Sequence, residues 1–153
     1  MNTIIEFLKT GVLGNIKIGQ TKNSVEKYLG VPEGISYNKS FITLKYGSIQ
    51  LSFYRKGKEG LEDYILKHIH IDFDNSVNFP NTLDLDGWLP TPDMSYPVFV
   101  EETKKYNVRI CKDEQHTFKN LQIGTKSDSG VIIIFDDENE GNKIISMSLF
   151  NPS

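Results

Sequence analysis

Alternating apolar and polar residues constrain the fold of this chain more than any other feature of its sequence. Between residues 41 and 73, apolar side chains recur at every second position in three short runs. Successive side chains of a β-strand point to opposite faces, so each run predicts a strand with one buried face. In the first run Phe41, Thr43 and Lys45 oppose Ile42, Leu44 and Tyr46. In the second run Ile49, Leu51 and Phe53 share one face, and in the third Ile69, Ile71 and Phe73 are predicted to lie inside. Short connections between these runs favour an antiparallel meander.

A similar pattern returns in the second half of the chain. Strands are predicted over 108–111 and 118–123, and two more contain Val131, Ile133 and Phe135, then Ile145, Met147 and Leu149. We therefore predict an α+β protein of two similar units, residues 1–78 and 79–153, each with a short helix or helix pair on an antiparallel sheet. A Pro- and Asp-rich linker, residues 79–94, joins the units, and we expect one compact globule because each unit alone is marginal in size. The alternative is that two unrelated antiparallel hairpins resemble each other by pattern alone.

Capping residues predict where the helices begin. Thr3 and Glu6 have the spacing of a capping box, in which each side chain accepts a backbone N–H of the first turn. Thr21 and Ser95 precede two further helical patterns. Gly11 and Gly30 mark the predicted ends of the first two helices.

Charge divides unevenly between the two halves. Residues 1–73 contain ten Lys or Arg and seven Asp or Glu, whereas residues 74–153 contain seven and thirteen. The linker also holds the only tryptophan, Trp88, and an aromatic side chain among polar groups is typical of an interface hot spot. The alternative is that Trp88 fills the junction between the units. The candidate partner-binding residues are Asp84, Asp86, Trp88, Asp93, Asp136, Asp137, Glu138 and Glu140.

Three groups of residues are candidates for a catalytic or metal site, and none of them forms a complete motif. His68, His70 and Asp72 alternate on one strand face, within reach of a shared metal, but this is also the solvent side of an amphipathic strand. The segment Asp84–Gly87 resembles the start of a calcium loop, yet the later ligands are missing, which favours a turn. Cys111 lies five residues before His116, and we expect it to be a small buried side chain. We predict no catalytic residue, metal or cofactor.

The sequence also favours a cytoplasmic protein. Its longest apolar run, residues 131–135, is far shorter than a membrane-spanning helix, and we find no signal peptide. A single cysteine allows no intramolecular disulfide, which fits a reducing compartment. Alanine is absent while Ile, Lys and Asn are abundant, as expected of an AT-rich bacterial genome.

One stretch resembles known families. The pattern Ile16-x-Ile18-Gly19-x-Thr21-x-x-x-Val25-x-x-x-Leu29-Gly30-x-Pro32, followed by a strand led by Tyr46-Gly47, is similar to outer-membrane-assembly lipoproteins of the SmpA type and to tandem-repeat β-lactamase inhibitor proteins. It is also similar to immunity proteins of bacterial polymorphic-toxin and contact-dependent growth-inhibition systems. The first two groups are exported, so the immunity proteins fit best. This resemblance implies binding of one cognate toxin domain. Because the second half is acidic, we expect a basic target such as a nuclease. We also expect a monomer or weak homodimer that binds no nucleic acid or membrane.

Two alternatives belong to other functional classes. One is an enzyme or metal-binding protein that uses the strand face of His68, His70 and Asp72. The other is a structural or adaptor domain that associates with itself through an exposed sheet edge, for which residues 131–135 are the predicted strand.

Overall fold

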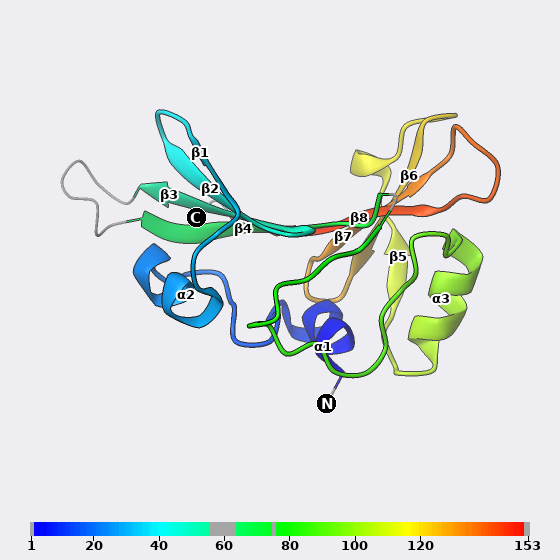
Figure 1. Cartoon of the computed structure of the whole chain (residues 1–153). Helices are drawn as coiled ribbons and strands as arrows, with labels where there is room; N and C mark the ends of the chain where they lie inside the picture. Colours follow the sequence, from blue (N-terminus) through cyan, green and yellow to red (C-terminus); the bar gives the residue numbers. More distant parts are fainter. Residues whose placement is uncertain (1, 56–63, 75, 152–153) are drawn as a thin grey trace.

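A single antiparallel sheet of eight strands organises the protein (Figure 1). The computed structural model describes residues 2–55, 64–74 and 76–151. The strand order across the sheet is β1-β2-β3-β4-β8-β7-β6-β5. The strands are β1 (Gly34–Tyr37), β2 (Phe41–Tyr46), β3 (Ile49–Arg55), β4 (Tyr64–Asp72), β5 (Ile110–Lys112), β6 (Gln122–Ser127), β7 (Ile132–Asp136) and β8 (Ile144–Phe150).

All three α-helices of the described residues lie on one side of this sheet, together with the linker that follows β4 (Figure 1). They are α1 (Thr3–Thr10), α2 (Lys22–Leu29) and α3 (Tyr96–Lys104), and a short 3-10 helix, η2 (Glu114–His116), precedes β6. The predicted α+β class is therefore confirmed, and its strands form one continuous sheet. The predicted boundary between residues 78 and 79 lies in the segment between β4 and α3.

The predicted alternation is confirmed by burial. Ile69, Ile71 and Phe73 are fully buried beneath the helices, whereas His68, His70 and Asp72 on the opposite face are partly exposed. Side chains from both halves form one hydrophobic core, in which Phe7, Phe53, Phe99 and Phe135 are among the largest fully buried members.

Two of the three predicted helix starts are confirmed. The Thr21 hydroxyl accepts a hydrogen bond from the Ser24 N–H at 3.2 Å, and the Ser95 hydroxyl accepts one from Val98 at 3.4 Å. The backbone of Gly11 is left-handed and ends α1, and α2 ends before Gly30.

The predicted capping box at Thr3 is wrong. Asn2 is the residue before the helix, and Thr3 is buried inside its first turn. The Thr3 hydroxyl donates to the Asp84 carbonyl at 3.1 Å and accepts from the Asp86 N–H at 2.9 Å. The Thr3 hydroxyl was predicted to bond to the start of the helix, but it bonds to the linker backbone instead. These two hydrogen bonds attach the linker to α1.

Strand predictions failed where the pattern of burial was weak. The pattern missed β1, because its residues are mostly exposed and show no alternation of burial. The strand predicted over 118–123 begins only at Gln122, since Phe118 and Leu121 are exposed and Asn120 has a positive φ of 63° that turns the chain. Ile16 forms an isolated bridge with Leu13.

A glycine in the linker provides a test of how strongly the linker supports the fold. Gly87 has a φ of +85°, and a Cβ built on it would lie 1.6 Å from the Asn2 side-chain oxygen. That oxygen accepts a hydrogen bond from the Trp88 N–H at 2.7 Å. We expect Gly87→Ala to lower the free energy of unfolding by roughly 2–3 kcal/mol, because it adds displacement of Asn2 to the backbone strain.

The matched control is Gly19→Ala, where φ is +100° and nothing lies within 4 Å of the added Cβ. This variant carries the strain alone, so we expect a loss of about 1 kcal/mol in the same urea titration. Equal losses in the two variants would show that the linker contact contributes nothing measurable.

Candidate binding surface

The sheet face opposite the helices carries an organised set of side chains. Figure 1 shows α1, α2, α3 and the linker on the other side of the sheet. We call the opposite side the uncovered face; η2 packs over Gly124 of β6 at one end of it. Strand register aligns its residues in rows across neighbouring strands. These rows are Phe41 with Tyr54; Thr43, Ser52, His68 and Phe150; Lys45, Gln50, His70, Ser148 and Ile132; and Asp72, Ser146 and Ile134.

Five rings form a connected row on this face. Phe41 stacks on Tyr54 with ring centroids 5.0 Å apart, and the Tyr54 ring reaches over β4 to Phe150 at 5.9 Å. Phe150 meets His68 at 5.5 Å, and His68 meets His70 at 6.0 Å. We call Phe41, Tyr54, Phe150, His68 and His70 the aromatic row. Half of the Phe150 surface is exposed, and the other members are partly buried.

The two histidines are held in the uncharged form by their surroundings. Burial lowers the pKa of His68 below its usual value, and the neighbouring His70 lowers it further. Burial also lowers the pKa of His70, with Asp72 partly opposing the shift. At neutral pH the aromatic row is therefore neutral.

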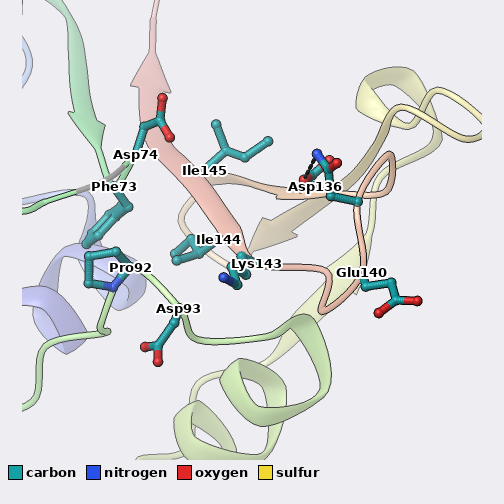
Figure 2. A pocket seen from close by; sticks show the side chains of 10 residues that line it. Phe73, Asp74, Pro92, Asp93, Asp136, Glu140, Lys143, Ile144 and Ile145 are labelled. Carbon is teal, nitrogen blue, oxygen red and sulfur yellow. Dashed lines mark hydrogen bonds between the residues drawn. The ribbon is translucent and has the colours of Figure 1, made fainter.

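A second feature lies where β4 ends and β8 begins. A pocket of about 460 Å³ is lined by Phe73, Asp74, Pro92, Asp93, Asp136, Asn139, Glu140, Lys143, Ile144 and Ile145. We call it the acidic pocket. Figure 2 shows Asp74 and Asp93 on one side of Lys143, with Asp136 and Glu140 on the other. The carboxylates surround the pocket and do not converge on one point.

Local hydrogen bonds fix two of these carboxylates in the charged form. The Thr91 hydroxyl donates to Asp93 at 2.5 Å, and this bond is the main reason that the pKa of Asp93 lies below its usual value. Asp136 accepts bonds from the Asn139 side chain and the Glu138 N–H, both at 2.9 Å, and these lower its pKa. Both groups are thus anionic at neutral pH.

The structure separates the predicted partner-binding residues into distinct groups. Asp93, Asp136 and Glu140 line the acidic pocket, and Asp74, which the prediction omitted, joins them. The exposed Glu138 and the half-buried Asp137 belong to the same β7–β8 loop. Asp84 and Asp86 lie elsewhere, around a second hollow that includes Thr3.

Trp88 belongs to neither the acidic pocket nor the aromatic row. Its ring is partly buried, 5.7 Å from Phe99 and 6.4 Å from Tyr106 between ring centroids. Trp88 therefore packs the linker against α3 and the residues that follow it. This contact fits the alternative in which Trp88 fills a junction in the interior better than it fits an exposed interface residue.

The candidate metal and thiol residues do not assemble into a site. Within residues 2–55, 64–74 and 76–151, no three His, Cys, Asp or Glu side chains lie in an arrangement that could hold a metal ion. The prediction that Cys111 is buried is wrong, because β5 is an edge strand and Cys111 is exposed there beside Lys126. His116 is hydrogen-bonded to Asp113.

The predicted strand for self-association is also wrong. Residues 132–136 form β7, which lies between β6 and β8 in the interior of the sheet. The edges are β1 and β5 instead. Among the described residues, no helix has the length and apolar character needed to cross a membrane.

Comparison of the chain with protein-family models, with curated proteins and with solved structures found no match. The functional argument therefore depends on the surface itself. The sequence placed His68 and His70 on the outward side of their strand, and it placed Phe41 on the side opposite Ile42. It could not show that Tyr54 and Phe150 join them, because this requires the register of β3, β4 and β8.

Acidification should destabilise the protein through the histidine pair. Both imidazoles have pKa values below 6.5 in the folded protein and near 6.5 in the unfolded chain. Below about pH 6.5 the unfolded state therefore binds more protons, so the stabilisation present above that pH is progressively lost as pH falls. We expect urea titrations from about pH 7.5 to about pH 5 to show this loss.

The double variant His68→Asn, His70→Asn should show a shallower dependence over the same range. Gln50→Asn, beside His70 on β3, removes no titratable group and should retain the slope of the parent protein. If the double variant loses stability with falling pH as steeply as the parent protein, other titratable groups cause the pH dependence.

Proposed function

We propose that this chain is an immunity protein: it neutralises a bacterial toxin domain by forming a stoichiometric complex with it, and it catalyses no reaction. The observation that carries this proposal is the uncovered face. A preformed row of aromatic side chains on a continuous sheet is suited to macromolecular contact, because rigid rings lose little conformational freedom on binding. The cytoplasm of the producing cell is the proposed site of action.

The acidic pocket and the β7–β8 loop support a basic partner. Asp74, Asp93, Asp136 and Glu140 create a negative potential at one end of β4 and β8, with Lys143 as the cation among the pocket residues. Such a field speeds encounter with an oppositely charged protein. A nuclease toxin fits this requirement, since it must be basic to bind phosphates.

We also propose that the two halves are copies of one ancestral unit. Support comes from the strand order, in which β1 to β4 form one meander, β5 to β8 form another, and the last strands of the two meanders pair. The halves differ in their helices, since α1 and α2 precede the first meander and α3 alone precedes the second. A doubled scaffold would explain how a small protein presents so broad a sheet.

Co-expression tests the proposed function directly. The probe is the polypeptide encoded by the gene next to this one, expressed from an inducible promoter in a bacterial host with and without this chain. We expect growth arrest by the neighbouring protein alone, rescue by co-expression, and a one-to-one complex by light scattering. Growth arrest without rescue, together with the absence of a complex, would overturn the proposal.

Electrostatic steering gives a second, kinetic test. Glu138 and Glu140 are exposed on the β7–β8 loop, and the double reversal Glu138→Lys, Glu140→Lys should slow association about tenfold at low salt and flatten its salt dependence. The matched control Glu101→Lys, Glu114→Lys changes the net charge equally at exposed positions of α3 and η2. If both pairs slow association equally, the effect comes from the net charge of the protein and not from the position of Glu138 and Glu140.

A further inference from the structure

We infer that the toxin domain docks on the uncovered face, with an apolar or aromatic segment over the aromatic row and lysine or arginine side chains directed along β4 toward the acidic pocket. This inference rests on the proposed function. It adds which surface of this chain binds the toxin domain and which side chains the toxin domain presents.

The aromatic row is not explained by the needs of the core. The hydrophobic core and the partly buried apolar side chains packed against it include Tyr64, Trp88 and Tyr106, but not Phe41, Tyr54 or Phe150. The three rings instead contact one another and the histidines on the opposite side of the sheet. Connected rings outside the core, one of them half exposed, are typical of a surface that contacts another macromolecule.

The chemistry of the face changes steadily along β4. His68, His70 and Asp72 point to the uncovered face at steps of about 6.6–6.8 Å along the strand, and Asp74 follows at the acidic pocket. A path therefore leads from neutral rings to a single carboxylate and then to Asp74, Asp136 and Glu140.

This gradient selects one kind of partner. A segment with an apolar or aromatic side chain at one end would contact Phe150 and Tyr54, and cationic side chains further along would approach Asp72 and the acidic pocket. Lysine and arginine also interact favourably with the faces of Phe and Tyr rings, so a basic protein surface is complementary to the whole path. The neutral state of His68 and His70 adds no positive charge at these two positions. Two lysines of the described residues lie near the path, Lys45 in the row of His70 and Lys143 in the acidic pocket.

A nucleic acid is the competing occupant. Aromatic side chains on an open sheet can stack with bases, but binding of a phosphate backbone requires cations along the path. Here the carboxylates of Asp72, Asp74, Asp136 and Glu140 outnumber the nearby cations Lys45 and Lys143. The observations therefore favour a protein partner.

The experiment measures the affinity of this chain for the protein encoded by the neighbouring gene, by isothermal titration calorimetry. Phe150→Ser removes an aromatic side chain that is 50% exposed in the row. Its control, Tyr28→Ser, removes an equally exposed ring, at 50%, from α2 on the other side of the sheet. We expect the dissociation constant to rise at least about tenfold for Phe150→Ser and less than about twofold for the control.

A second variant tests the same surface by obstruction. Ser148 lies beside His70 on β8, so Ser148→Arg places a bulky cation in the path without removing a ring. We expect a comparable loss of affinity. Thermal unfolding of each variant confirms that it is folded before titration.

The outcomes separate the inference from the proposed function. If the parent protein does not bind its neighbour's product, the proposed function fails and the inference fails with it. If the parent binds and both Phe150→Ser and Ser148→Arg bind equally well, only the inference is overturned, because docking occurs elsewhere. Binding of a mixed-sequence single-stranded oligonucleotide that Phe150→Ser abolishes would also overturn it, in favour of a nucleic-acid partner.

Discussion

The pairing of β4 with β8 is the constraint on which the rest of the structure depends. These strands lie far apart in the chain, and their register joins His68–Asp72 to Ser146–Phe150. This register places Ile69 and Ile71 beside Leu149 and Met147 under the helices, and it leaves His68 beside Phe150 on the other face. A slip by one residue would exchange the two faces of β8. The register of β4 with β8 therefore determines both the core and the aromatic row.

One-sided coverage of the sheet follows from the same arrangement. The three α-helices and the linker pack on the apolar face, and hydrogen bonds between the linker backbone and the side chains of Asn2 and Thr3 hold the linker there. Antiparallel sheets commonly bury one face and leave the other to solvent. What distinguishes this sheet is that its outward positions carry connected rings as well as serine, threonine and lysine.

Local patterns in the sequence predicted the parts of the fold that depend on neighbouring residues. Alternation identified the inward face of the strands around Phe53 and Ile71, and hydroxyl caps located the starts of α2 and α3. The errors arose where distant residues decide the outcome. The linker occupies the Thr3 hydroxyl, and the sheet order places residues 132–136 in the interior. The aromatic row could not be predicted, because Tyr54 and Phe150 meet only across β4.

The aromatic row lies on paired strands, whereas the acidic side chains of Glu138 and Glu140 lie on a loop. This difference suits the two regions to different stages of binding. The aromatic row lies on paired strands whose rings are already in contact, so its geometry changes little when a partner arrives, which favours slow dissociation. Glu138 and Glu140 are exposed on a connecting loop, where charge acts over a distance without close fit. Because Asp72 and Asp74 connect the two regions along β4, attraction at the loop would guide a basic segment toward the rings. Fast capture and tight retention would then be properties of one continuous surface, set by the order of residues along a single strand.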